Sequence, residues 1–277
     1  MKVRVATCAV LPEPDADEAP LAAALAAAGI DAPLVAWDDP AADWESALPT
    51  ILRSTWNYAE RIDAFEVWLD RVRGPLVNPR DVVRANIHKR YLLELRARGV
   101  AVVPTTLVPR GATHDLASID APRIVIKPEV GCASLGTRVF EPRDPAAVAH
   151  LASLAASGDV LVQPYVDSVD DYGERSMVWI DGELSHAIRK TPRFSGDDER
   201  VDGPFPIAPE ERDVAVAALA PYADRILYGR VDLARDAHGH PMVMELELIE
   251  PSLFFAKHPP SLDRYVAGLI RRLTSGG

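Results

Sequence analysis

The 277-residue sequence has only two cysteines, Cys8 and Cys132, and no cluster of histidine or cysteine surrounds either of them. The sequence therefore predicts neither a disulfide framework nor a zinc site, and it favours a reducing cytoplasm. Positive charge is also scarce, since 30 lysines and arginines stand against 41 acids and give a net charge of -11. Such a chain lacks the basic face of a general nucleic-acid binder, although a local basic pocket for a nucleotide remains open.

Long hydrophobic runs are absent as well. No stretch approaches the roughly 20 apolar residues of a membrane span, and prolines and acids interrupt the N-terminal apolar run, so neither a transmembrane segment nor a signal peptide is predicted. With 48% hydrophobic and 26% charged residues, the chain has the composition of a soluble globular protein. Its length suits one large domain or two to three small ones.

The first 100 residues alternate between strand and helix patterns. Short apolar strands separated by amphipathic helices are typical of a parallel α/β domain. The sequence predicts strands at 3–10, 32–37 and 50–56, and helices at 19–28, 62–72 and 85–99.

The pattern changes in the rest of the chain, where hairpins join the helices. Asp181 and Gly182 lie between two apolar runs, which is a strong hairpin signal. Hairpins mixed with helices indicate a mixed sheet, and a polar loop is expected at 191–209. The predicted strands lie within 123–141, 160–166, 176–190, 228–236 and 241–250, and the predicted helices at 145–158, 210–223 and 261–273.

The stretch VMELELIEPS combines the apolar pattern of a buried strand with acids. Side chains alternate between the two faces of a strand, so Glu245 and Glu247 share one face, and Asp232 lies in the preceding predicted strand. Carboxylates on adjacent strands are the hard oxygen ligands that Mg²⁺ takes. The alternative is that each acid pairs with an arginine, such as Arg230 or Arg175. We favour the metal, because like charges among buried apolar residues need a concentrated positive charge.

Two lysines and one interrupted strand suggest an anion site. Lys127 ends a predicted strand directly before a loop with Gly131 and Gly136, and such loops let backbone N–H groups approach phosphate oxygens. Lys89 lies in a predicted helix, and the strand that contains Gln163 is broken by proline, which leaves an apolar slot suited to an adenine edge. Taken singly, each feature has a simpler explanation: a hairpin turn, a solvated lysine and an edge strand ended by proline.

Together and in this order, these elements resemble an ATP-grasp enzyme over roughly residues 78–257. The hairpin GERSMVWIDGELSHAIRK is similar to that of glutathione synthetase-like and ribosomal-protein-modifying ligases. The stretches RSTWNY, SHAIRK and ELELIEPS are similar to small ATP-grasp cyclo-ligases that form D-cycloserine from O-ureidoserine. Glu247 departs from the asparagine that many ATP-grasp members have at this position, which makes the local charge more negative but preserves metal binding.

The resemblance implies an ATP-grasp fold, α/β and α+β, in which an N-terminal parallel α/β domain (1–100) precedes two α+β subdomains (101–166 and 167–277) that enclose ATP. It implies a cytoplasmic ATP-dependent carboxylate–amine ligase, with an intramolecular cyclo-ligase as one form, that makes an acyl phosphate and releases ADP and phosphate. A small-molecule kinase or a non-catalytic nucleotide-binding protein is the alternative. The expected cofactors are ATP and two Mg²⁺ ions, for which Mn²⁺ can substitute. The expected partners are small carboxylate and amine substrates, with no nucleic acid and no membrane, and a homodimer is compatible with the family.

The resemblance also implies roles for individual residues. Simpler alternatives remain for some of them: Trp56 favours core packing, Arg189 and Lys190 could be a solvated strand end, and loop 191–209 is either a lid or a linker. ATP contacts are implied for Lys89, Lys127, Gly131, Ser134, Gly136, Gln163, Pro164, Tyr165, Val166 and, at the ribose or substrate, Glu174; metal binding for Asp232, Glu245 and Glu247; stabilisation of reacting charge for Arg189 and Lys190; and substrate binding for Arg53, Asn57, Tyr58 and Arg230.

Overall fold

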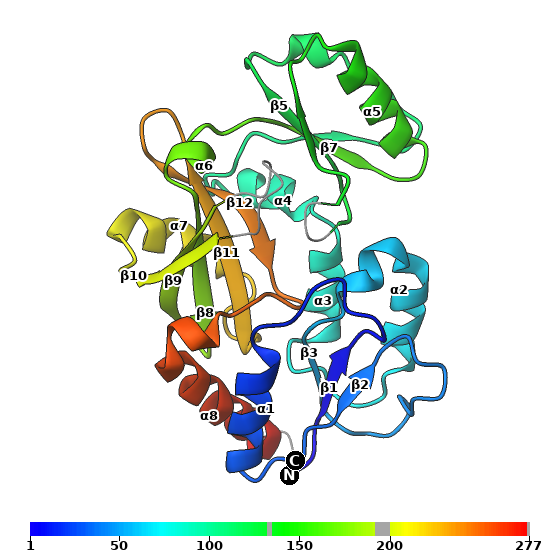
Figure 1. Cartoon of the computed structure of the whole chain (residues 1–277), viewed down its shortest axis with the longest axis vertical. Helices are drawn as coiled ribbons and strands as arrows, with labels where there is room; N and C mark the ends of the chain where they lie inside the picture. Colours follow the sequence, from blue (N-terminus) through cyan, green and yellow to red (C-terminus); the bar gives the residue numbers. More distant parts are fainter. Residues whose placement is uncertain (132–134, 192–199, 276–277) are drawn as a thin grey trace.

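The computed structural model describes residues 1–131, 135–191 and 200–275. Its N-terminal part contains a parallel sheet in the order β2-β1-β3, as the strand and helix patterns predicted (Figure 1). Phe65, Trp68 and Leu69 form the buried stripe of the second helix, with the spacing of one helical face. The elements are β1 (Arg4–Thr7), α1 (Glu18–Ala27), β2 (Leu34–Ala36), β3 (Thr50–Leu52), the 3₁₀ helix η1 (Trp56–Glu60) and α2 (Ile62–Arg71).

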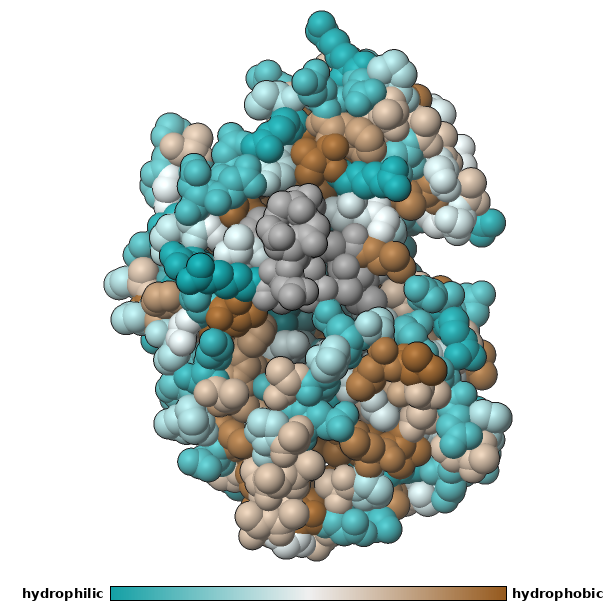
Figure 2. All heavy atoms as spheres, viewed as in Figure 1, coloured by the Kyte–Doolittle hydropathy of each residue, from teal (hydrophilic) through white to brown (hydrophobic). Residues whose placement is uncertain are grey.

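A second, antiparallel sheet forms the central lobe at the top of Figure 1, in the order β4-β7-β5-β6. Its apolar residues pack with those of α5 in a core of their own. The surface is indented between this lobe and the N-terminal part (Figure 2). Because β7 pairs with both β4 and β5, the edge-strand explanation for the strand with Gln163 is wrong. The elements are β4 (Thr106–Val108), η2 (Leu116–Ser118), β5 (Ile124–Pro128), β6 (Arg138–Phe140), α5 (Pro145–Ala155) and β7 (Val160–Pro164).

The C-terminal sheet is antiparallel, in the order β10-β9-β8-β11-β12. Asp181 and Gly182 both have positive φ, +49° and +94°, as a two-residue hairpin turn requires, so the predicted hairpin is confirmed. The remaining elements are α6 (Ser168–Asp171), β8 (Glu174–Ile180), β9 (Glu183–Thr191), β10 (Arg200–Phe205), α7 (Pro209–Leu219), β11 (Tyr228–Arg235), β12 (Pro241–Glu247), η3 (Phe255–Lys257) and α8 (Pro259–Ser275).

Two predicted elements differ from the structure. The predicted helix at 85–99 is two helices, α3 (Arg80–Ile87) and α4 (Tyr91–Ala97), with an extended residue, His88, between them. The predicted loop at 191–209 contains strand β10, which pairs with β9, while 192–199 lie outside the described residues. No helix among the described residues is long and apolar enough to span a membrane.

The N-terminal part and the C-terminal lobe share one core. Val3 and Val5 of β1 lie in the same buried cluster as Tyr228 and Tyr265. Buried Asn78 strengthens this junction, because its amide donates to the Tyr228 and Leu248 carbonyls at 2.8 and 2.7 Å. Loops of the N-terminal part are therefore fixed against the strands of the C-terminal sheet.

Candidate active site

A cavity of about 520 Å³ is lined by the central sheet, the C-terminal sheet and loops of the N-terminal part. Its size is that of a small-molecule site. Thirteen of the residues singled out from the sequence line it, although they come from all three parts of the chain. These are Tyr58, Lys89, Lys127, Gly131, Gln163, Pro164, Tyr165, Val166, Glu174, Lys190, Arg230, Glu245 and Glu247.

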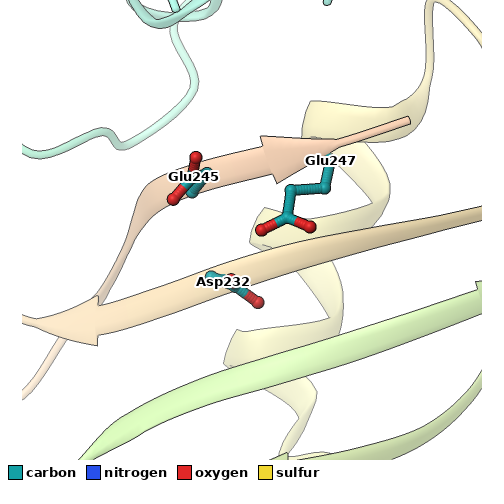
Figure 3. A group of neighbouring side chains, drawn as sticks. All are labelled: Asp232, Glu245 and Glu247. Carbon is teal, nitrogen blue, oxygen red and sulfur yellow. The ribbon is translucent and has the colours of Figure 1, made fainter. Parts of the chain in front are cut away.

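Two carboxylates that line this cavity, those of Glu245 and Glu247, converge with that of Asp232, which is fully buried and not itself part of the lining. Asp232 on β11 pairs in register with Glu245 on β12, and Glu247 lies two residues further along β12 (Figure 3). One oxygen from each side chain lies within 4.8 Å of the others. The register shifts between Asp232 and Leu233, since Leu233 pairs with Val243 and Met244 is left out of the pairing, so the bulge lies beside Asp232 and Glu245. The donor set fits Mg²⁺, which binds oxygen ligands from one or two carboxylates together with water and phosphate.

Three cations neutralise these acids. Arg230 forms two bonds of 2.9 Å to Asp232 and also contacts Glu247. Lys190 lies 2.9 Å from Asp232, and Lys89 pairs with Glu245. The alternative of arginine pairing thus holds for Arg230, and the same acids still converge as a metal site would require.

The other arginine named in that alternative has a different partner. The Arg175 guanidinium lies 3.0 Å from the carboxylate of buried Glu211, and Arg175 does not line the cavity. This second buried pair of Arg and Glu is therefore a structural feature of the C-terminal lobe, separate from the carboxylate cluster.

Several titratable side chains of the cavity wall have strongly shifted pKa values, as at many functional sites. Burial raises the pKa of Glu174 to about 8 and that of Glu247 to about 7, although Lys190 and Arg230 respectively oppose the shift. Burial lowers the pKa of Lys127, which has no ion-pair or hydrogen-bond partner among the described residues. The cavity wall therefore has acids with raised pKa values and a lysine that forms no direct ion pair with a described residue, although Glu245 opposes the lowering of its pKa.

Glu129, which sequence analysis did not single out, explains the break in the helix around Lys89. Its buried carboxylate accepts hydrogen bonds from His88 Nδ1 at 2.8 Å and from the Arg90 backbone N–H at 3.1 Å. Its carbonyl accepts from the Lys89 N–H at 3.1 Å. Because these bonds replace helical ones, the chain turns out of the helix, and Lys89 reaches Glu245 and the Gly131 carbonyl.

Replacing Glu129 by glutamine should lower the free energy of unfolding by about 1–3 kcal/mol at pH 7. Burial alone would raise the pKa of Glu129, but His88 and Arg90 hold it below its usual value. The stabilisation is therefore present above the unfolded-state pKa and is lost as pH falls through the lower folded-state pKa. Urea unfolding should show a difference between parent and variant that shrinks below about pH 4.

Exposed Glu141 provides the control, since Glu141→Gln should change nothing at either pH. A difference for Glu129→Gln that stays constant from pH 7 down to about pH 3 would contradict the charge-based explanation.

At the end of the cavity formed by β7, two successive hydrogen bonds fix the orientation of the Gln163 amide. The Thr105 hydroxyl donates to the Val103 carbonyl at 2.7 Å, so its oxygen must accept from Gln163 Nε2 at 2.8 Å. The amide oxygen of Gln163 is then the group left to accept a hydrogen bond from a ligand. Tyr165 lies nearby with the Arg123 guanidinium 3.9 Å from its ring centroid.

The opposite end of the cavity contains residues that the sequence analysis missed. Trp56 was expected to pack in the core, yet it lines the cavity, and its Nε1 donates to the Glu250 carbonyl at 3.2 Å. Burial, with neighbouring Glu247, raises the pKa of Glu250 to about 8. The stretch ELELIEPS, which contains Glu250 and Ser252, was the sequence signal for two of the missed residues. The residues missed at this end are Pro12, Glu13, Glu250, Ser252 and Phe254.

Several predicted site residues do not reach the cavity. Arg53 is 2% exposed and bonds to Asp17 and to the Pro251 carbonyl. Asn57 bonds to Trp37 and to Asp38. These side chains are committed to packing the N-terminal part, so the structure does not bring either of them to a substrate.

On β9, successive side chains face opposite ways, so Lys190 enters the cavity while Arg189 reaches Asp202 on β10 at 3.4 Å. Gly136 has a φ of +73°, and its carbonyl lies 2.9 Å from His150 Nε2; Gly136 is not itself part of the cavity lining, although Leu135 and Thr137 are. Ser134 lies outside the described residues.

Comparison with known proteins places these features in context. The family model for the D-cycloserine synthetase DcsG N-terminal domain matches residues 3–78. The cycloserine biosynthesis protein DcsG of Streptomyces lavendulae is 37% identical over 284 residues, covering 94% of both chains. The crystal structure of D-cycloserine synthetase DcsG is 34% identical, with a TM-score of 0.89 over 99% of this chain and 100% of that one. ATP-grasp ligase PsnB, complexed with a precursor variant, Mg and ADP, is 19% identical with a TM-score of 0.63 over 96% of this chain and 98% of that one, which shows a shared fold.

Proposed function

Since the chain belongs to the D-cycloserine synthetase family of ATP-grasp ligases, we propose that it closes a ring within an amino-acid derivative. It has the ATP-grasp fold and is an ATP-dependent carboxylate–amine ligase. Relatives named for cycloserine, a cyclic amino-acid derivative, support the intramolecular form of this ligation. The kinase and the non-catalytic binding protein are not favoured.

The ATP-dependent part of the proposal rests mainly on the convergence of Asp232, Glu245 and Glu247 beside the cavity. We propose that these acids hold Mg²⁺, and that the additional negative charge of Glu247 favours two ions, with Mn²⁺ as a substitute. Mg²⁺ with ATP would supply positive charge at the phosphoryl group that is transferred. Lys89 and Lys127 border the same wall and are proposed to contact phosphate oxygens.

At the nucleotide end, the acceptor oxygen of Gln163 suits the amino group of adenine. Pro164, Tyr165 and Val166 continue the apolar lining there, and Glu174 is proposed to contact ribose or substrate. We propose that backbone N–H groups of the loop with Gly131, Ser134 and Gly136 contact the phosphates.

The chemistry proposed has two steps. The substrate carboxylate attacks the terminal phosphorus of ATP, which yields an acyl phosphate and ADP. An amine of the same molecule then attacks the acyl carbon, so that a C–N bond forms, phosphate leaves and the nitrogen loses a proton. Because Lys190 and Arg230 face the cavity, we propose that they stabilise the developing negative charge, and that Arg189 instead supports β10.

The far end of the cavity supports a substrate with an amino group. Glu13 and Glu250 line the cavity together with Trp56 and Tyr58, and a bound ammonium group would favour the charged form of Glu250 that burial disfavours. We therefore propose a small amino-acid derivative as the substrate. Separately, we propose a homodimer as the assembly, which is compatible with the family.

An isotope experiment tests the function. An aminooxy amino acid with ¹⁸O at both carboxylate oxygens should give one ADP, one phosphate and one ring product, with one ¹⁸O atom in the phosphate and the other in the ring carbonyl. The matched compound with a methyl ether in place of the aminooxy group should give no ring. A stable phosphorylated product without free phosphate would indicate a kinase, and no ADP with any amino-acid derivative would reject the proposal.

A further inference from the structure

The segment 251–255, which follows β12, is held by side chains from distant parts of the sequence. Its residues Ser252 and Phe254 line the cavity at the proposed substrate end. The Pro251 carbonyl accepts from Arg53 Nη1 at 2.9 Å, and the Ser252 carbonyl accepts from Arg230 Nη1 at 3.2 Å. The segment therefore owes its shape to these side chains.

Asp17, at the start of α1, holds the backbone N–H groups of the same segment. Its carboxylate accepts from Leu253 at 2.5 Å, from Phe254 at 3.1 Å and from Phe255 at 2.8 Å. Asp17 is 1% exposed, and its carboxylate lies 3.3 Å from the Arg53 guanidinium. One buried pair thus bonds three consecutive N–H groups and one carbonyl of the segment.

Phe254 adopts a conformation that needs such support. Its φ of +54° and ψ of +43° lie in the left-handed region, which residues other than glycine rarely adopt. Its ring lies 5.8 Å from the Arg230 guanidinium, beside the carboxylate cluster. Uncommon backbone conformations of this kind persist only where surrounding bonds enforce them.

We propose that the Asp17–Arg53 pair positions the 251–255 segment, and through Ser252 and Phe254 sets the affinity for the carboxylate substrate. This inference rests on the proposed function and deepens it. Arg53 acts here through the segment and not as a direct substrate clamp. The N-terminal part thereby controls the substrate end of the cavity through this segment.

Asp17→Asn tests the proposal, because it keeps the size of the side chain but replaces one acceptor oxygen by a donor. Hydrogen exchange of the protein without ligands should show slow exchange at the N–H groups of 253–255 in the parent and at least tenfold faster exchange in the variant. With the aminooxy substrate, KM should rise at least tenfold, while the affinity for a non-hydrolysable ATP analogue stays within twofold.

Glu211→Gln provides the matched control. Glu211 is also buried, and it pairs with Arg175 at 3.0 Å away from the cavity lining. This variant should leave both the exchange at 253–255 and the KM unchanged, so a general loss of stability is distinguished from loss of positioning. Arg53→Lys serves if Asp17→Asn does not fold, since lysine keeps the charge but lacks the planar fork whose separate nitrogens bond the Pro251 carbonyl and Asp17.

Unchanged exchange at 253–255, or an equal loss of ATP affinity and substrate affinity, would overturn the inference. The exchange measurement needs no substrate. Faster exchange in the variant with no ring formation by the parent would therefore reject the proposed function alone, whereas ring formation with an unaltered KM would reject the positioning role alone.

Discussion

Replacing Glu245 by glutamine should reduce ATP-dependent ring formation by about 10²–10³-fold or more, a loss typical of removing one electrostatic contact to the transition state. The change keeps the shape of the side chain but removes the negative charge of one of three converging carboxylates. It also deprives Lys89 of its ion-pair partner. Coupled ADP release measured over a range of Mg²⁺ concentrations should show that excess metal restores only part of the rate.

The control for this prediction is Glu210→Gln on α7, a glutamate whose side chain is 52% exposed. It should show parental turnover. Circular dichroism should show that Glu245→Gln remains folded, because no core volume is lost. Near-parental turnover in Glu245→Gln at limiting Mg²⁺ would remove Glu245 from the metal site.

The elements governed by local sequence could be predicted. The hairpin at Asp181 and Gly182 is specified by residues that adopt positive φ, and the acids of β12 are specified by alternation along one strand. The interrupted helix around Lys89 could not be predicted from local pattern. It depends on Glu129, which is 41 positions away from His88, and no helical periodicity encodes that contact.

The residues at the substrate end of the cavity could not be predicted from the sequence for a related reason. An arginine after a strand in an α/β domain suggested a ligand clamp, but Arg53 is buried against Asp17, which in turn holds Phe255 from 238 positions away. The direction in which side chains of β9 face was a second feature that the sequence could not predict. A sequence places Arg189 and Lys190 on opposite faces but does not say which face meets the cavity, and only the pairing of β9 with its neighbours decides that.

Replacing Lys127 by methionine should weaken binding of a non-hydrolysable ATP analogue by about 30-fold or more, because a charged contact in a partly dry site is worth about 2–5 kcal/mol. The same change should leave the ligand-free protein as stable as the parent or more stable. Burial lowers the pKa of Lys127 although nearby Glu245 opposes the shift, and no described residue forms an ion pair or hydrogen bond with its ammonium group, so we expect its buried charge to cost stability until an anion binds. Isothermal titration and urea unfolding measure the two effects separately.

Lys89→Met is the contrasting variant, because Lys89 lies on the same wall but already pairs with Glu245 and donates to the Gly131 carbonyl at 2.7 Å. It should lose affinity for the nucleotide analogue and also lose stability, since Glu245 would be left without its nearest cation. The opposite responses of stability in the two variants separate a lysine reserved for a ligand from one that also supports the fold. If Lys127→Met is destabilised like Lys89→Met and keeps its affinity for the analogue, Lys127 is a structural residue, and the phosphate contacts must come from Lys89 and Lys190.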